Sequence, residues 1–359
     1  MCFQAGFEVD RGDELTDDRL LALVDECAAL GVREWVIAGG GEPMLRGDVV
    51  VQLCERIRSY EMNGVIQTNG VTFQSEHFAR LMEVGWSTVA VSLDGPTREI
   101  NDAIRCPGAF EKATATVRKL AALKRERGVA QPVLSIFGVV TAYNYERLAE
   151  FVSFVHALGC DAVGLGQLIV HGPSNRYLEV PAERLGELMA NVEAARRCAE
   201  ELGLDHNFHA LLGTEAEEAS GRHAIRGARS SCCLAHAVCF EPWLSLLVCA
   251  DGKVSPCCRL WDVDDEGLAE RSLADLWRES PYLQAVRQAL SSGRPLPPCA
   301  QCPPDLRSRN EALRPLLAWA QQSTPRRLGL LAAKAVASTR RHGLRRALER
   351  GREWLRIMR

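Results

Sequence analysis

The sequence lacks several features that would assign it to a specialised class of protein. It has no run of 18 apolar residues, and residues 1–4 are not followed by the apolar core of a signal peptide. A membrane-spanning helix needs about 20 predominantly apolar residues, so we expect a cytoplasmic protein that is neither inserted nor secreted. Internal repeats and low-complexity blocks are also missing, which argues against a solenoid or a disordered chain.

Net charge is small, but it is unevenly distributed. The chain has 43 Lys or Arg against 46 Asp or Glu, for a net charge of −3. Residues 326–359 hold eleven of the basic residues and two Glu, so this tail carries about +9 and the remainder about −12. An acidic body argues against general nucleic-acid binding. The tail has apolar residues between its arginines, so we expect a basic amphipathic helix that contacts a membrane surface or an acidic partner, or one that covers the acidic body.

Cysteine, by contrast, is abundant, with 14 residues. A reducing compartment rarely keeps disulfides, and 359 residues with 47% hydrophobic content can form a core without them. Metal or cluster ligation is therefore the leading explanation. Cys27 and Cys54 lie in predicted helices and are expected to be buried. Cys106 and Cys160 are expected to be core residues, with a hydrogen-donor role as the alternative.

Apolar runs alternate with segments of helical periodicity through the first 170 residues. The predicted strands are Trp35–Ala38, Gly64–Thr68, Thr88–Leu93, Val133–Val140 and Ala162–Leu168. The predicted helices are Leu15–Leu30, Val49–Tyr60, Ser75–Glu83, Phe110–Arg127, Tyr145–Leu158 and a long helix from Pro181 to about Leu202. This alternation predicts a parallel α/β sheet or barrel, in which chemistry occurs at the carboxyl ends of the strands.

The first predicted strand ends in three consecutive glycines, Gly39–Gly41, followed by Glu42 and Pro43. Without Cβ atoms, this backbone can approach a ligand closely and adopt positive φ. A tight turn would have the same composition. However, the other predicted strands also end in glycine or polar residues, which favours a binding edge: Gln67–Gly70, Ser92–Gly95, Thr141, Asn144 and Gln167.

A second constellation follows, in which Cys239 and Cys257 flank a predicted turn and Cys299 and Cys302 form a C-x-x-C pair. Asp251-Gly252 predicts a hairpin that brings the first two cysteines together. We predict one amphipathic helix over Ser272–Leu290. Four thiolates are enough for one tetrahedral site, but their spacing does not separate zinc from iron–sulfur.

With these motifs in order, the chain resembles radical S-adenosylmethionine enzymes of the SPASM/Twitch subgroup over about residues 2–305. The resemblance implies a partial (β/α)6 TIM-like barrel that lacks its first strand, followed by a small cysteine-rich domain. We expect a barrel at 1–180, a helical connector at 181–230, an auxiliary iron–sulfur domain at 231–305 and the basic tail at 306–359.

The resemblance also implies roles for individual residues. The Gly-Gly-Glu-Pro loop would contact the amino group of S-adenosylmethionine, and Ser92 and Asp94 would face its ribose or the substrate. Cys239, Cys257, Cys299 and Cys302 would ligate one auxiliary 4Fe-4S cluster, a Twitch-like arrangement because the C-x5-C-x3-C segment of a full SPASM domain is missing. The implied cofactor-binding residues are Gly40, Gly41, Glu42, Pro43, Asn69, Ser92, Asp94, Asn144 and Gln167.

The sequence departs from the family at its start. The family holds its catalytic 4Fe-4S cluster with C-x3-C-x2-C, and only Cys2 stands in that register, as the third cysteine. We expect that the chain is truncated and that the first two ligands precede Met1. A degenerate, non-catalytic relative is the alternative.

The resemblance implies generation of a 5′-deoxyadenosyl radical that abstracts hydrogen from a substrate, followed by oxidation or epimerisation. The expected substrate is a small molecule such as an aminocyclitol or sugar, with a peptide as the alternative. The expected electron donor is a flavodoxin or ferredoxin. A non-enzymatic, zinc-stabilised binding protein is the competing class.

Overall fold

The computed structural model describes residues 14–170, 173–212, 239–260 and 267–302, together with residues 306, 310 and 313. The chain divides into two units, 1–306 and 307–359, and the description below concerns the first. Cys2, residues 213–230 of the expected connector and the basic tail at 326–359 lie outside the described residues.

The first unit contains a parallel sheet of six strands in the order β1-β2-β3-β4-β5-β6. Each strand pairs with the next one along the chain, as Thr88 opposite Val133 illustrates for β3 and β4. The α/β architecture predicted from the alternation is therefore confirmed. The strands are β1 (Glu34–Ile37), β2 (Asn63–Thr68), β3 (Thr88–Ser92), β4 (Val133–Val140), β5 (Ala162–Gln167) and β6 (Asp205–His206).

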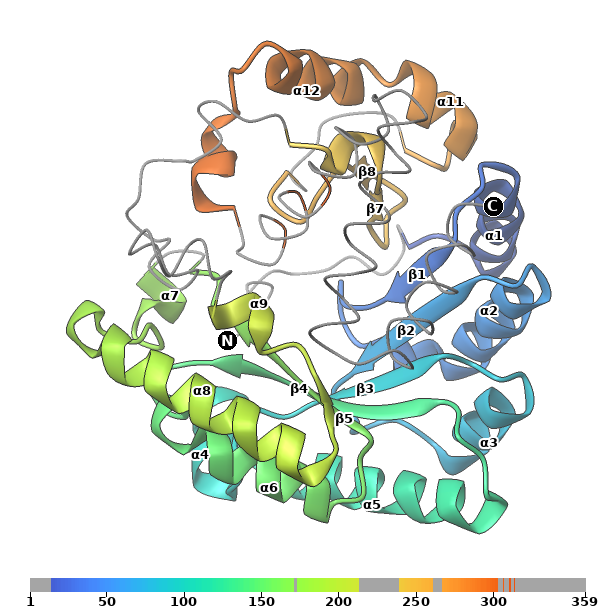
Figure 1. Ribbon diagram of the computed structural model, residues 1–359. Coiled ribbons are helices and arrows are strands. Elements are labelled where there is room, and N and C mark those ends of the chain that lie inside the picture. Colours follow the sequence, from blue (N-terminus) through green and yellow to red (C-terminus); the bar gives the residue numbers. More distant parts are fainter. Residues whose placement is uncertain are drawn as a thin grey trace, which may run out of the picture. The chain divides into compact units, whose positions relative to one another are not determined.

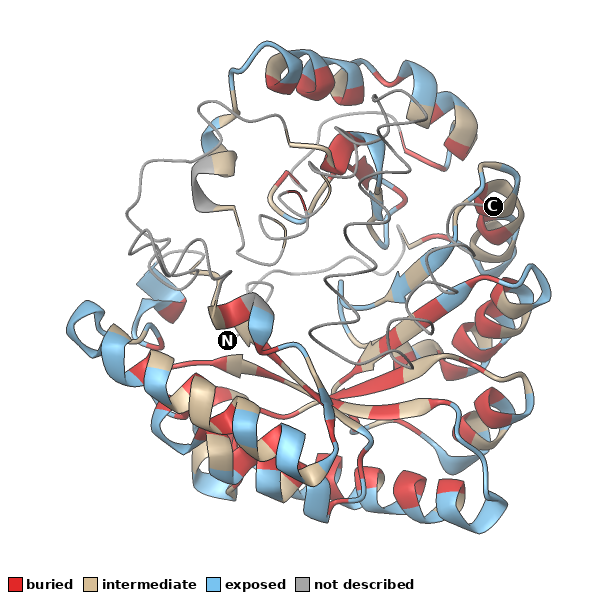
Figure 2. Ribbon diagram, in the orientation of Figure 1, coloured by how far each residue is buried: buried red, intermediate tan, exposed pale blue. Residues whose placement is uncertain are grey.

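Helices connect the strands and lie along one face of the sheet (Figure 1). Buried residues run along the strands and along the helix surfaces turned toward them (Figure 2). The helices are α1 (Asp17–Ala29), α2 (Gly47–Ser59), α3 (Ser75–Glu83), α4 (Arg98–Ile104), α5 (Ala109–Arg127), α6 (Leu148–Ala157), α7 (Pro173–Arg176), α8 (Leu185–Leu202) and α9 (His209–Leu212).

Local signals fix the ends of α1, which starts two residues later and ends one residue earlier than predicted. The Oγ1 of Thr16 accepts a hydrogen bond from the amide of Arg19 at 3.3 Å, which satisfies a free donor of the first turn. Gly31 follows the helix with φ +78°, a conformation that glycine adopts without strain.

The side chain of Asn207 forms hydrogen bonds with the backbone of β5 where β6 ends. On the side away from β4, β6 pairs with β5 through two residues, Asp205 and His206. Beyond them, the amide group of Asn207 continues the ladder, since its Oδ1 accepts from the amide of Leu165 at 2.8 Å and its Nδ2 donates to the carbonyl of Leu165 at 2.9 Å. The Asn207 side chain thus satisfies both backbone groups of one edge residue.

The cysteine-rich segment begins with the predicted hairpin. Strands β7 (Leu247–Val248) and β8 (Val254–Ser255) pair antiparallel, and Gly252 between them has φ +84°. The hairpin prediction is therefore confirmed.

The prediction of one helix over Ser272–Leu290 is wrong. Two helices, α11 (Leu273–Glu279) and α12 (Pro281–Ser291), occupy this stretch. Pro281 has no amide hydrogen and cannot continue α11, whereas it is well suited to the first position of α12. The Ser280 side chain caps α12 by accepting from the amide of Leu283 at 3.2 Å.

The cysteine-rich segment is fastened to α1. The amide of Leu15 donates to Ala250 at 2.8 Å, and Nε of Arg19 donates to the carbonyl of Leu268 at 2.9 Å. The amide of Leu273 donates to Glu26 at 2.5 Å. Behind these bonds lies a shared apolar cluster formed by Leu15, Leu23, Cys27, Val254, Leu268, Leu273 and Leu276.

Candidate functional site

The glycine loop after β1 presents bare backbone. Gly40 has φ +101° and Gly41 has φ +143°, so both adopt conformations in which side chains are rare. A Cβ placed on Gly41 would find no atom of the described residues within 4 Å. Backbone at this strand end is therefore open to a ligand, as the sequence predicts.

Glu42 joins this loop to the end of β2. Its Oε1 accepts from the amide of Met44 at 3.0 Å and from the hydroxyl of Thr68 at 2.6 Å, and its Oε2 accepts from the amide of Asn69 at 2.7 Å. An ionised carboxylate offers about four lone-pair positions, so roughly one remains, on Oε2. The geometry leaves Glu42 able to accept from one additional donor.

Asp94, just beyond β3, is fully buried, and its carboxylate contacts other residues of the chain. Its Oδ1 accepts from the amide of Val139 at 2.7 Å, and Nε of Arg105 lies 2.7 Å from its Oδ2. Burial raises the pKa of the Asp94 carboxyl, while the Arg105 charge and the Val139 hydrogen bond oppose that rise. The Nε–H of Arg105 is not aimed at the oxygen, so the contact is an ion pair more than a hydrogen bond. The Arg105 side chain is partly exposed, with 20% of it accessible.

Asn144 fastens the ends of β3 and β4 together. Its Nδ2 donates to the carbonyls of Asp94 at 2.7 Å and Val139 at 2.8 Å, and its Oδ1 accepts from the amide of Thr141 at 2.7 Å. Both amide hydrogens of this buried side chain are therefore used inside the protein.

Gln167, at the end of β5, has a side-chain oxygen that could accept a hydrogen bond from a ligand. Its Oε1 is buried and has no hydrogen-bond partner among the residues that the structure describes. An unsatisfied buried acceptor costs about 1–3 kcal/mol, so this atom is expected to meet a donor when the site is filled.

Ser92 ends β3 and is half-buried. The Oδ1 of Asn69 accepts from the amide of Val71 at 2.7 Å, in a turn after β2.

Three of the four predicted auxiliary ligands lie around one apolar cluster. Cys239, Cys257 and Cys299 pack against Leu260, Val286 and Leu290. The amide of Cys302 donates to the carbonyl of Cys299 at 3.1 Å, which places it one turn away. Thiolates from a hairpin and a C-x-x-C turn are ligands of iron–sulfur clusters and of zinc alike.

The two thiols proposed as hydrogen donors have different surroundings. Cys160 is 7% exposed, and burial raises its pKa to about 12. Cys106 is exposed. Cys160 therefore occupies the environment of a core residue.

Arg105 is a candidate that sequence reasoning missed. It lies eleven residues after Asp94, beyond the short helix α4. Neither periodicity nor a motif linked the two residues, and a charged residue closely following a strand-end carboxylate was the only signal.

None of the helices in the described ranges is both long and apolar enough to cross a bilayer.

Comparison with protein families assigns two parts of the chain. Residues 1–155 match the radical SAM superfamily. Residues 239–303 match SPASM, an iron–sulfur cluster-binding domain.

Several curated proteins are similar to this chain in sequence. The mycofactocin maturase MftC of Mycobacterium tuberculosis is 33% identical over 158 residues, which cover 44% of this chain and 38% of that protein. MftC of Mycolicibacterium smegmatis is 27% identical over 302 residues, covering 80% of this chain and 68% of that protein. The AdoMet-dependent heme synthase of Oleidesulfovibrio alaskensis is 23% identical over 296 residues, covering 76% and 69%.

Solved structures agree with the fold. Streptococcus suis SuiB bound to S-adenosylmethionine has a TM-score of 0.58 and 17% identity, covering 80% of this chain and 63% of that one. The anSMEcpe structure with bound AdoMet has a TM-score of 0.59 and 17% identity, covering 80% and 78%. The two matched domains imply S-adenosylmethionine and iron–sulfur clusters as cofactors. The chain thus carries a radical SAM domain over residues 1–155 and a SPASM iron–sulfur cluster-binding domain over residues 239–303.

Proposed function

We propose that this chain is an enzyme that binds S-adenosylmethionine at the strand ends and abstracts a hydrogen atom from its substrate. The observation that carries the proposal is the buried, unpartnered Oε1 of Gln167 at the end of a strand, in the same sheet as the open glycine loop. Bound S-adenosylmethionine and a reduced 4Fe-4S cluster would supply the radical chemistry.

The chain's own residues would bind and orient the cofactor. Gly40, Gly41 and Pro43 would shape the loop, and the remaining acceptor position on Glu42 would receive the cofactor's ammonium. Asn69, Ser92 and Gln167 would offer polar groups from three other strands.

Asp94 and Asn144 would act as positioning residues, because their side-chain atoms are engaged in the chain. Arg105 is held in place by its ion pair with Asp94, and its exposed part would bind a carboxylate group of a bound ligand. Cys2 would be one ligand of the catalytic cluster.

Cys239, Cys257, Cys299 and Cys302 would hold one auxiliary 4Fe-4S cluster. Such a cluster could accept an electron from the substrate, which favours net oxidation, with epimerisation as the other outcome. A flavodoxin or ferredoxin would supply the electron that starts the cycle.

For the substrate we favour a peptide over an aminocyclitol or sugar. SuiB has been solved bound to its precursor peptide SuiA, and anSMEcpe with a Kp18Cys peptide. These neighbours support the proposal that a peptide can enter a barrel of this type. The heme synthases among the relatives make a tetrapyrrole the alternative substrate to test.

The auxiliary cluster is tested by anaerobic reconstitution with iron and sulfide. We expect iron and sulfide in the wild-type chain, and a loss of one cluster's content in Cys299→Ala and Cys302→Ala. Cys258→Ala, which changes the exposed neighbour of Cys257, is the control and should keep its cluster. A colourless protein with one zinc and no iron would end the radical proposal.

The cofactor site is tested by equilibrium dialysis of S-adenosylmethionine against Gln167→Met. A neutral hydrogen bond contributes about 0.5–1.5 kcal/mol, so we expect affinity to fall by about 2- to 12-fold. Gln52→Met, at an exposed position of α2, should bind as the wild type does. Equal affinity in all three proteins would remove Gln167 from the site.

A further inference from the structure

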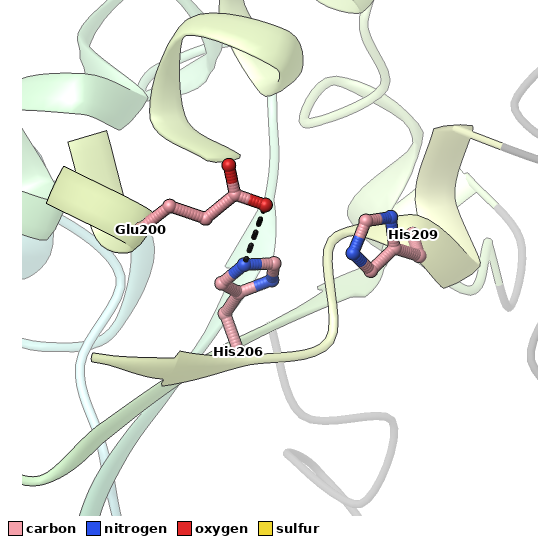
Figure 3. Close-up of side chains that lie close together, drawn as sticks. All are labelled: Glu200, His206 and His209. Carbon is pink, nitrogen blue, oxygen red and sulfur yellow. Dashed lines mark ion pairs between the residues drawn. The ribbon is translucent and has the colours of Figure 1, made fainter. Parts of the chain in front are cut away.

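A group of metal-ligating side chains lies away from the strand ends described above. Glu200 near the end of α8, His206 on β6 and His209 at the start of α9 each place one ligand atom within 4.8 Å of the others. Figure 3 shows the three side chains turned toward one another. None of them takes part in the proposed cofactor or cluster sites.

The backbone that carries these residues is fixed before any ion binds. Gly203 ends α8 with φ +71°, and the amide of Leu204 donates to Ala199 at 2.9 Å. The amide of Asp205 then donates to Asp161 at 3.1 Å, which docks β6 beside β5. A ligand set held by the backbone loses less conformational entropy on binding than a set on mobile loops.

The two imidazoles are also held in place. The ring of His206 stacks on Phe208 with centroids 5.0 Å apart and an interplanar angle of 22°. The ring of His209 lies 5.2 Å from that of His206, centroid to centroid. Neutral imidazole is the form of the side chain that ligates metals.

The positive charge nearest to Glu200, that of Arg196, is also paired with Glu193. Nη1 of Arg196 lies 2.6 Å from Oε1 of Glu200, and Nε2 of His206 lies 3.8 Å from the same oxygen. The Nε and Nη2 of Arg196 both donate to Glu193, at 2.7 and 2.6 Å. Because Glu193 holds the guanidinium independently, the Glu200 carboxylate can bind an ion without leaving Arg196 unpaired.

We propose that Glu200, His206 and His209 form a binding site for one divalent transition-metal ion, with zinc as the representative metal. Two imidazole nitrogens and one carboxylate oxygen are a recurrent zinc donor set, with ligand distances of about 2.0–2.2 Å. Tetrahedral ligands at that radius lie about 3.4 Å apart, close to the 3.8 Å between His206 and Glu200. His206 is 9% exposed and Glu200 49% exposed at the side chain, so water would complete the coordination from the Glu200 side.

Binding would require one proton rearrangement. The Nδ1 of His206 accepts a long hydrogen bond of 3.4 Å from the amide of Phe208, which places the ring proton on Nε2. Ligation through Nε2 moves that proton to Nδ1 and gives up this weak bond, with no net release of protons. The bound ion would tie the end of α8 to the start of α9 across the edge strand.

The test is a zinc titration of the full chain in competition with a chromophoric chelator. Wild type and His156→Gln, a control at an exposed position of α6, are expected to bind one more equivalent than His209→Gln. Glu200→Gln, which keeps an oxygen for Arg196, should weaken the same equivalent. Because loss of a ligand's partner alone costs about 10–100-fold in metal affinity, we expect about 100-fold or more. The same zinc stoichiometry and affinity in wild type and His209→Gln would overturn the proposal.

Cobalt separates this site from the cysteines. The Co²⁺ spectrum of wild type minus that of His209→Gln should show d–d bands without thiolate charge-transfer absorption in the near ultraviolet. A difference spectrum carrying thiolate bands would assign the lost equivalent to cysteine and refute the proposal. Because His209 is exposed, its replacement by Gln should leave the circular dichroism spectrum of the chain unchanged.

Discussion

The surroundings of two cysteines show how burial decides the chemistry of a single residue. Cys160 and Cys106 both lie near strand ends in the sequence, yet only Cys106 is exposed. Burial raises the pKa of Cys160 to about 12. A thiol whose pKa is raised in the folded state stays protonated until the pH approaches that value, and its contribution to stability is lost as the pH rises above about 9.

This difference predicts selective alkylation. At pH 8.5 a thiol with a pKa of about 12, such as that of Cys160, is ionised in roughly one molecule in 3,000. We expect iodoacetamide to label Cys106 in the folded chain and to leave Cys160 unlabelled until denaturant is added, as read by peptide mass spectrometry. Rapid labelling of Cys160 in the native protein would show that it is accessible and restore it as a candidate hydrogen donor.

The ion pair between Asp94 and Arg105 shows where prediction from residues stops. Asp94 and Gln167 were selected from the sequence because they end apolar runs. The burial of Asp94, its Arg105 partner and the orphaned Oε1 of Gln167 depend on how separate strands and loops meet. Those contacts are tertiary and leave no local pattern.

Among the elements, strands and long helices were predictable because their apolar residues repeat. Val133–Val140 and Ser75–Glu83 agree with the structure to the residue. Helix α4 was missed because it has only seven residues, and β6 because Asp205 and His206 are polar and pair through the sheet edge. The break at Pro281 could have been predicted, since proline removes a helix hydrogen bond.

Packing between elements predicts the effect of a single methyl group. A Cβ on Gly138 of β4 would lie 2.7 Å from the carbonyl oxygen of Leu93 and 3.2 Å from the ring of Phe151. Backbone cannot move away cheaply, so we expect Gly138→Ala to lower the free energy of unfolding by about 1–3 kcal/mol, measured by urea denaturation.

A matched substitution provides the control. A Cβ on Gly186, in α8, would meet nothing within 4 Å. Alanine is favoured over glycine inside helices by roughly 0.5–1 kcal/mol, so Gly186→Ala should stabilise the chain. If both variants lose the same stability, close contact at β4 is not the cause.

At the scale of the whole first unit, the cluster shared by α1 and the cysteine-rich segment should make the two unfold together. Leu276 of α11 is fully buried in that cluster. Leu276→Ala should cost about 2–5 kcal/mol and shift the transitions seen by far-ultraviolet circular dichroism and by tryptophan fluorescence equally.

Leu244→Ala, which alters a side chain that is 56% exposed, should change stability by less than about 0.5 kcal/mol. Separate transitions in Leu276→Ala, with the barrel signal unchanged, would show that the cysteine-rich segment folds independently.

The side chain of Asn207 has a consequence for the chain's behaviour at high concentration. An edge strand with free amide and carbonyl groups is a template for pairing with another molecule. Because Asn207 bonds both backbone groups of Leu165, these groups are not available to pair with a strand of another molecule. The Asn207 side chain therefore disfavours intermolecular sheet growth, and with it aggregation, where β5 extends past β6.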